Sequence, residues 1–241
     1  MKLKTSILSC LTLCLAIVVN AQERVHLNSK TTTTSYNFSN YDAFEVSGDF
    51  KVNLNFSNSE ESISLEANNN IIDKVDIYKD GNTLKLKLKH NWNWKGRLIL
   101  NVDISTKGMI NTFKLSGDAV VKVNDAIRTN SLELMLKGDS ILEAEIKTNE
   151  LRLMAKSDSV VTLSGSVDKL EAHLSSDSLL KGKELTIENA DLDLSGDSEA
   201  WIVVSETLSA VASGDSILRY AGNPNVKRSV ATGDSEIHRM N

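Results

Sequence analysis

Hydrophobic and polar residues alternate with a period of two over most of the chain from residue 41 onward. This alternation is typical of β-strands that bury one face, whereas helices repeat their apolar positions about every 3.6 residues. In the second half of the chain, the apolar positions precede a recurrent aspartate by seven, five and three residues. Two such triplets are Leu132/Leu134/Leu136 and Leu151/Leu153/Ala155. The pattern predicts a series of strands that share one interior.

A short polar element, often Ser-Gly-Asp-Ser, interrupts these strands at near-equal intervals of 21, 19, 19, 20, 18 and 19 residues. Glycine, aspartate and serine are the residues that tight turns favour. Each repeat is therefore a strand, a tight turn, a second strand and a looser return, and no repeat could bury its apolar face alone. The aspartates of the seven turns are Asp118, Asp139, Asp158, Asp177, Asp197, Asp215 and Asp234.

Stacking successive repeats about 4.8 Å apart would bury the shared face and pair every backbone with its neighbours. The sequence thus predicts an all-β fold, a single-stranded right-handed parallel β-helix (β-solenoid) with repeats of about 19 residues. Outward residues six positions before the turn aspartates alternate in charge, as cross-strand neighbours should: Glu133, Arg152 and Glu171. An antiparallel sandwich is the alternative. It would explain the alternation and the turns, but not the near-fixed intervals.

Residues 1–21 have the features of a secretory signal peptide: Lys2 and Lys4, an apolar stretch over residues 7–19, and small residues at the end. The mature chain is expected to begin near Gln22. Both cysteines, Cys10 and Cys14, lie in this segment, so no disulfide or thiolate site is expected afterwards. A competing interpretation makes Cys14 a lipid-anchor site.

The rest of the chain divides into a leader and one solenoid domain. Residues 22–40 are polar and are expected to form a flexible leader. The solenoid is expected over residues 41–241, with regular repeats at 111–241. Residues 41–110 are predicted to form irregular rungs, with a hairpin turn at Asp80-Gly81, that cap the N-terminal end.

Three features together resemble a known family: Phe-Glu-Val-Ser-Gly-Asp at residues 44–49, Val-Asp-Ile-Tyr-Lys-Asp-Gly-Asn-Thr-Leu at 75–84, and the serial Ser-Gly-Asp turns. The chain resembles the auto-transporter adhesin "head GIN" domain family of exported Bacteroidetes proteins over about residues 41–238. The resemblance implies a single-chain parallel β-helix with an adhesive role, and without the catalytic residues of pectin-lyase-like folds. The sequence departs from the family's turn by favouring Gly-Asp-Ser and by lacking glycine at Ser157 and Ser176.

Composition narrows the choice of partners. The 241 residues include 27 Lys and Arg against 32 Asp and Glu, a net charge of −5, and no basic run. Nucleic acid is therefore not an expected partner. After the signal segment no apolar stretch approaches the roughly 20 residues of a membrane-spanning helix, so the mature chain is expected to have none.

The aspartate column has the greatest chemical content. Carboxylates about 5 Å apart would repel by roughly 3 kcal/mol per neighbouring pair at an effective dielectric of 20. Hydrogen bonds from the turn backbone to each aspartate, as in an Asx-turn, would relieve that repulsion. The alternative is that the column binds Ca²⁺, although one carboxylate per rung is a poor ligand set. No other cofactor is expected.

Three tryptophans are candidate ligand contacts. Trp92 and Trp94 lie in a polar loop, where they could stack on sugar rings or anchor a protein partner. The alternative is that they fold over an open rung and cap the core. Trp201 occupies an outward position four residues after Asp197 and is a further candidate contact.

No catalytic constellation is visible. Asp191 and Asp193 form an acidic pair on one strand face, without a second catalytic element. The histidines share no metal-ligand spacing: His26, His90, His173 and His238.

The sequence favours an exported, non-catalytic binding or adhesion module for a cell-surface or carbohydrate ligand, located in the periplasm, on the outer-membrane surface or outside the cell. One alternative is a carbohydrate-active enzyme of the lyase or hydrolase type. Another is a structural envelope protein that assembles end to end through its last rung, at residues 236–239.

Overall fold

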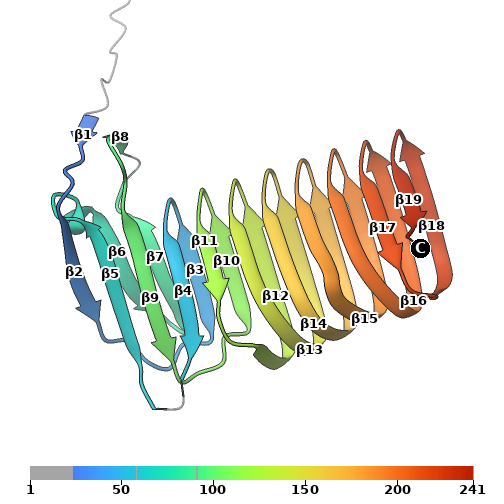
Figure 1. Ribbon diagram of the computed structural model, residues 1–241, viewed down its shortest axis with the longest axis horizontal. Coiled ribbons are helices and arrows are strands. Elements are labelled where there is room, and N and C mark those ends of the chain that lie inside the picture. The colour runs from blue at the N-terminus through green and yellow to red at the C-terminus, as the bar shows by residue number, and fades with distance from the viewer. Residues whose placement is uncertain (1–23, 58, 91, 241) are drawn as a thin grey trace, which may run out of the picture.

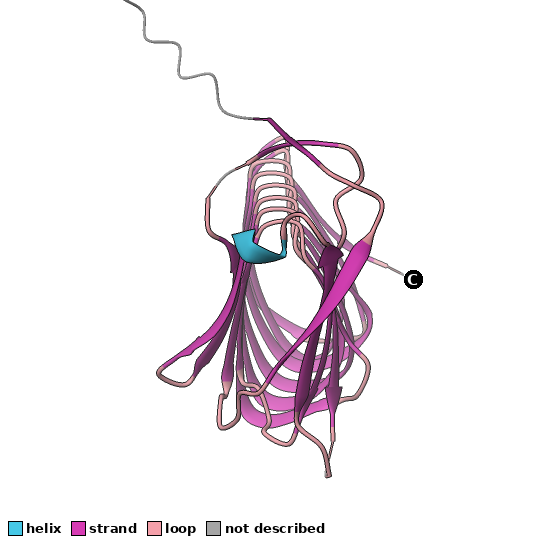
Figure 2. Ribbon diagram, turned by 90° about the vertical axis from the view of Figure 1, so that its left-hand side faces the viewer, coloured by secondary structure: helices cyan, strands magenta, loops and turns pink. Residues whose placement is uncertain are grey.

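The computed structural model describes residues 24–57, 59–90 and 92–240. Their strands form an elongated coil whose rungs stack along one axis (Figure 1). Two sheets face each other across a hydrophobic interior (Figure 2). The predicted β-solenoid with coils of about 19 residues is confirmed. The predicted signal segment, with Cys10 and Cys14, lies outside the described residues.

Each regular rung spans both sheets. In β13 (Ile141–Lys156), residues 141–143 pair with β11 (Val120–Val123), whereas residues 150–156 pair with β12 (Ile127–Lys137). We call the sheet whose strands precede the Gly-Asp turns the pre-turn sheet, and the sheet whose strands follow them the post-turn sheet. The remaining strands of the regular part are β10 (Thr112–Ser116), β14 (Val160–Ser175), β15 (Leu179–Ser195), β16 (Glu199–Gly214), β17 (Ile217–Ala221), β18 (Asn225–Gly233) and β19 (Glu236–Arg239).

The predicted apolar columns are confirmed by the strand register. Leu132 pairs with Leu151, Leu151 with Leu170, Leu170 with Ala190, and Ala190 with Leu208, all in parallel. All five side chains are buried. Like residues therefore lie above one another in the interior, which the alternative antiparallel sandwich would not produce.

The Gly-Asp turns also stack. The Asp215 N–H donates a hydrogen bond to the carbonyl oxygen of Gly196 in the preceding rung, at 2.9 Å. Ser157 and Ser176 have φ values of 61° and 59°, the left-handed conformation that the turn glycines adopt. The two serines that replace glycine therefore keep the turn geometry and leave the column intact, at a local conformational cost.

The first rung of the sequence is not the first rung of the stack. β3 (Ala43–Ser47) lies between β7 (Thr83–Leu88) and β10, and β4 (Lys51–Phe56) lies between β9 (Leu100–Thr106) and β11. The chain thus lays down an inner rung, moves outward, and then returns to build on the other side. Strand order follows chain order only from β10 onward.

Antiparallel strands complete the N-terminal end. β6 (Val75–Asp80) forms the predicted hairpin with β7, while β5 (Ser62–Asn68) pairs antiparallel with β9. β2 (Thr31–Tyr36) then pairs antiparallel with β5. The expectation of a flexible leader over residues 22–40 therefore differs from the structure. The open edge of β5 offers backbone hydrogen bonds to any extended segment, and threonine-rich segments have high β-propensity.

The other elements near this end are short. They are the 3₁₀ helix η1 (Ile72–Lys74) and the parallel pair β1 (Arg24–His26) and β8 (Asn93–Lys95). Within the described residues, no helix has the length and hydrophobicity needed to cross a membrane.

Candidate functional site

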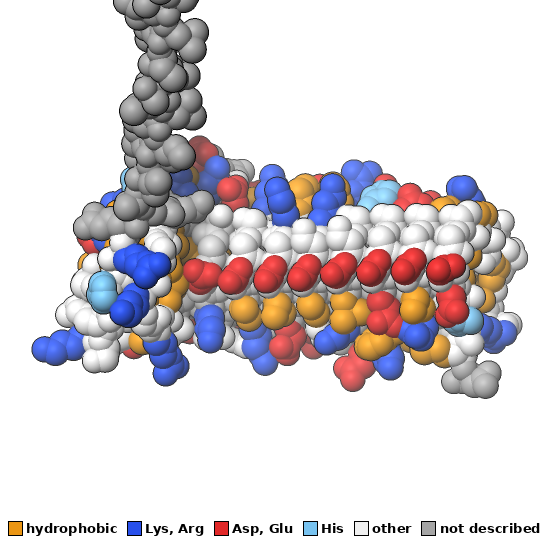
Figure 3. Space-filling model, turned by 90° about the horizontal axis from the view of Figure 1, so that it is seen from above, with side chains coloured by type: hydrophobic (Ala, Val, Ile, Leu, Met, Phe, Trp, Pro, Cys, Tyr) orange, Lys and Arg blue, Asp and Glu red, His pale blue; other side chains and the backbone are white. Residues whose placement is uncertain are grey.

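The turn aspartates form one acidic row along the solenoid, with a row of hydrophobic side chains beside it (Figure 3). The row contains the seven predicted aspartates, all exposed: Asp118, Asp139, Asp158, Asp177, Asp197, Asp215 and Asp234. Asp49, from the inner rung of β3 and β4, extends the row beyond Asp118. Burial, and then the neighbouring Asp118 carboxylate, raise the pKa of Asp49. Like-charge repulsion therefore has its effect where the row is least hydrated.

The serine after each aspartate holds the turn. Ser178, Ser216 and Ser235 each accept a hydrogen bond at Oγ from the backbone N–H three residues earlier, at 3.1, 3.2 and 3.0 Å. The expected bonds to the aspartates are absent from the hydrogen bonds of the described turns. The serines therefore fix the backbone, and the carboxylates stay free to face solvent.

The aspartate row does not by itself form a metal centre. In the described part of the chain, no group of three or more His, Cys, Asp or Glu side chains could hold a metal ion. Ca²⁺ prefers six to eight oxygen ligands, and each rung of the row supplies one carboxylate. Calcium binding stays a prediction from the sequence.

The tryptophan loop lies at the N-terminal end of the solenoid. The rings of Trp92 and Trp94 are 6.1 Å apart, and the Lys74 Nζ lies 4.2 Å from the Trp92 ring centroid. The ring of His90 is 5.8 Å from that of Trp92. Trp94 packs against the hydrophobic core. These contacts favour the interpretation of this loop as a cap.

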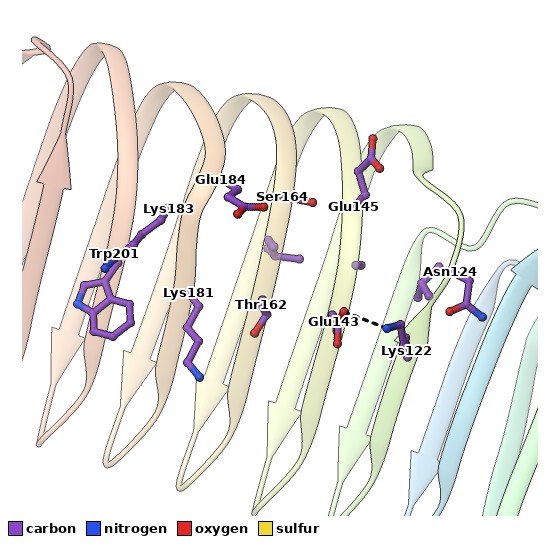
Figure 4. Close-up of a pocket in the computed structure, with 13 residues that line it drawn as sticks. Lys122, Asn124, Glu143, Glu145, Thr162, Ser164, Lys181, Lys183, Glu184 and Trp201 are labelled. Carbon is purple, nitrogen blue, oxygen red and sulfur yellow. Dashed lines mark ion pairs between the residues drawn. The ribbon is translucent and has the colours of Figure 1, made fainter.

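Trp201 belongs to a different surface, on the outside of the post-turn sheet. Strand register places one outward residue from each rung in a row that ends at Trp201. A second row runs parallel to it, and an open groove of about 450 Å³ extends over both (Figure 4). The first row is Lys122, Glu143, Thr162, Lys181 and Trp201, and the second is Asn124, Glu145, Ser164 and Glu184.

A β-bulge in β15 shapes the groove at its Trp201 end. Between Gly182 and Thr186, β15 contains three residues that have no counterpart in β16. The bulge carries Lys183, whose Nζ lies 4.4 Å from the centroid of the Trp201 ring. A Cβ on Gly182 would lie 3.0 Å from the Trp201 carbonyl oxygen, so glycine permits the close approach of the two strands. Bulges commonly redirect a side chain next to a functional site.

Two ion pairs organise the groove. The Trp201 Nε1–H donates to Glu199 Oε1 at 3.0 Å, and Glu199 is also paired with Arg219. At the other end, Lys122 Nζ lies 3.3 Å from Glu143 Oε1. Sequence reasoning selected Trp201 but missed Lys183 and the rest of the groove. The available signal was the change in turn spacing from 20 to 18 residues around Asp197.

The acidic pair Asp191 and Asp193 lies on the opposite, pre-turn sheet. His173 Nδ1 is 3.4 Å from Asp193, and His173 Nε2 is 3.6 Å from Glu171. Arg152 Nε lies 3.5 Å from the other Glu171 oxygen. These solvent-accessible side chains form a charge ladder of the kind expected between neighbouring strands.

The family relationship follows the fold. Residues 40–224 match the family described as "Putative auto-transporter adhesin, head GIN domain". The chain belongs to this family, as the Ser-Gly-Asp turns indicated. Membership supports a binding or adhesion role and an exported or surface location at that general level.

Solved structures share the whole fold at low sequence identity. A "putative adhesin" from Bacteroides fragilis is 16% identical, with a TM-score of 0.83, covering 90% of this chain and 100% of that one. A "putative adhesin" from Parabacteroides merdae is 18% identical, with a TM-score of 0.73, covering 90% and 99%. A "Putative lipid binding protein" from Parabacteroides distasonis is 15% identical, with a TM-score of 0.70, covering 91% and 100%. No curated protein matches the sequence.

Proposed function

We propose that this protein is an exported, non-catalytic binding module that presents a rigid outer surface to a ligand on a cell surface or in the surrounding matrix. Family membership supports adhesion in general. The observation that carries the proposal is the groove on the post-turn sheet. There, an aromatic ring and several charged and hydroxyl side chains face outward from paired strands.

Rigidity makes this surface suitable for binding. The groove rests on β13, β14, β15 and β16, which pair along most of their lengths. Side chains held on such a scaffold lose little conformational freedom when a ligand binds. Export is the remaining part of the proposal, and the signal peptide predicted at residues 1–21 supports it.

An array of glycans and extracellular-matrix proteins tests the proposal directly. The chain without its predicted signal segment, residues 22–241, is labelled and applied to the array. We expect saturable binding to at least one ligand class, with no change of the ligand. A chain that binds nothing on the array, in repeated preparations with native far-UV circular dichroism, would refute a binding function.

The enzymatic alternative has its own assay. Incubation of the same chain with a panel of acidic and neutral polysaccharides, followed by measurement of new reducing ends and of unsaturated products, separates hydrolases and lyases from binders. We expect no turnover. Sustained release of products would replace the binding module with a carbohydrate-active enzyme.

End-to-end assembly is a second candidate, favoured by the exposure of the last described rung. Val226 of β18 aligns with the buried Leu208 of the previous rung, yet it is 41% exposed. Exposed strand edges readily pair with other chains. Sedimentation velocity over a concentration series tests this candidate, and a monomer at every concentration would exclude it.

A further inference from the structure

The two ends of the groove differ in charge. At one end, Lys181 and Lys183 flank Trp201, and neither lysine has an ion-pair partner among the described residues. At the other end, Lys122 is neutralised by Glu143 at 3.3 Å. The Trp201 end therefore keeps two free ammonium groups, in a protein whose net charge is −5.

Trp201 is held in position before any ligand arrives. Its Nε1–H donates to Glu199 at 3.0 Å, while the Lys183 ammonium lies 4.4 Å from its ring centroid. Glu199 is in turn paired with Arg219, so its charge is already compensated. An indole fixed in this way offers a flat apolar surface with polar groups around it, which suits the face of a sugar ring.

The remaining lining groups suit hydroxyl-bearing sugars. Thr162 and Ser164 contribute hydroxyl groups from β14, and Glu184 contributes a carboxylate from the β15 bulge. A lipid chain would find little support here, because Ala144 and Leu163 are buried beneath the polar rows. Lysine and glutamate alternate along the groove, which is unlike the continuous basic track of a nucleic-acid site.

We propose that this groove binds an acidic oligosaccharide, with a uronate ring stacked on Trp201 and its carboxylate bound by Lys181 and Lys183. The next sugar units run along the solenoid axis, over Thr162 toward Glu143. Charge-assisted hydrogen bonds from ammonium groups to a carboxylate supply the preference for an acidic sugar. This inference rests on the proposed binding function and names the ligand class of the same surface.

Fluorescence of Trp201 gives a direct test. The chain has three tryptophans, so a Trp92→Phe/Trp94→Phe variant leaves Trp201 as the only indole. This variant is titrated with hexamers of mannuronate, galacturonate and hyaluronan, and with mannohexaose as the neutral counterpart of mannuronate. We expect at least one acidic hexamer to change the fluorescence with a Kd below about 1 mM. Binding should weaken as NaCl rises from about 0.1 to about 1 M.

Variants locate the site by calorimetry in the otherwise native chain. Trp201→Ala should weaken binding of the acidic hexamer at least about tenfold. Lys181→Gln/Lys183→Gln should also weaken it about tenfold, without reducing any residual binding of the neutral hexamer. A matched control, Lys137→Gln/Lys156→Gln on the pre-turn sheet, should leave the affinity unchanged. Trp201→Phe replaces the alanine variant if thermal melting shows that the latter does not fold.

The outcomes separate this inference from the proposed function. If the array shows a ligand but no acidic hexamer binds with a Kd below about 1 mM, the binding function stands and the acidic-oligosaccharide site is wrong. Equal affinity for mannuronate and mannohexaose, or unchanged affinity in the groove variants, would also overturn the inference. A chain that binds nothing on the array refutes the proposed function itself.

Discussion

Replacement of Gly196 by alanine should break the contact between two stacked turns. Gly196 has a φ of +70°, and a Cβ at this position would lie 2.9 Å from the Cα and N atoms of Ser176 in the preceding rung. Gly81, in the β6–β7 hairpin, provides the matched comparison. Its φ is +57°, but no atom lies within 4 Å of the corresponding Cβ. Both substitutions impose left-handed strain, and only Gly196→Ala adds a clash with backbone.

The magnitudes can be worked from these contacts. Left-handed strain costs an alanine about 1–2 kcal/mol, and the smaller entropy of the unfolded chain returns about 0.4–1 kcal/mol. Gly81→Ala should therefore lower the free energy of unfolding by roughly 1 kcal/mol or less. Overpacking against backbone that cannot rotate away adds about 1–3 kcal/mol. Gly196→Ala should thus cost about 2–4 kcal/mol in total.

Urea denaturation followed by far-UV circular dichroism measures both variants against the parent chain. The expected result is a clear fall of the midpoint for Gly196→Ala and a small fall for Gly81→Ala, with similar slopes. If the two variants lose the same stability, the stacked turns do not constrain each other. The account of the turn column given above would then be wrong.

Three further results are expected. Ser178→Ala should lower the free energy of unfolding by about 1 kcal/mol, because Ser178 Oγ accepts a turn hydrogen bond, whereas Ser140→Ala should be neutral or stabilising, because the buried Ser140 Oγ has no hydrogen-bond partner; urea midpoints that fall equally would contradict this. Asp49→Asn should raise the melting temperature at pH 7, because the raised pKa of Asp49 means that its charged form destabilises the fold. This gain should vanish as the pH falls below about 3.8, where the wild-type carboxyl is neutral in both states, and an identical gain at pH 3.5 and 7 would refute the assignment. Trp94→Ala should lower stability by roughly 1–3 kcal/mol, since the ring packs on the core, while leaving ligand binding on the array unchanged; lost binding at full stability would instead make this loop the contact surface.

The regular half of the fold could be predicted from the sequence because its long-range contacts repeat. A residue such as Leu151 pairs with the equivalent residue of the next repeat, Leu170, so the interval between turns already encodes the register. The outward position of Trp201 and the charge alternation between Arg152 and Glu171 follow from the same register. Period and spacing together therefore replaced the tertiary information that sequences usually hide.

The N-terminal end was less predictable because its partners are set by open edges, not by a repeat. Nothing in the Thr31–Tyr36 segment indicates that it pairs with β5, because most of its side chains are exposed and its bonds are made by the backbone. The placement of β3 between β7 and β10 likewise depends on which edges are available when the chain returns. Propensity and periodicity carry no information about such choices.

The candidate groove lies between these cases. Its first row follows from the repeat, whereas Lys183 depends on extra residues in one strand and a short neighbouring rung. A unit of 20 residues followed by one of 18 indicates such a local irregularity, but not the direction in which the extra side chain will point. Only the paired strands show that the lysine turns onto the Trp201 ring.

The interior position of β3 and β4 has a consequence for biogenesis. A chain that crosses a membrane with its amino end leading would deliver residues 43–56 first, yet both neighbours of that rung arrive later, from residues 83–106 and 112–123. The earliest segment must therefore wait as an unpaired template until material more than fifty residues downstream has emerged. Once β10 and β11 have docked, each following coil finds a finished edge, and maturation can advance at the pace of translocation, coil by coil.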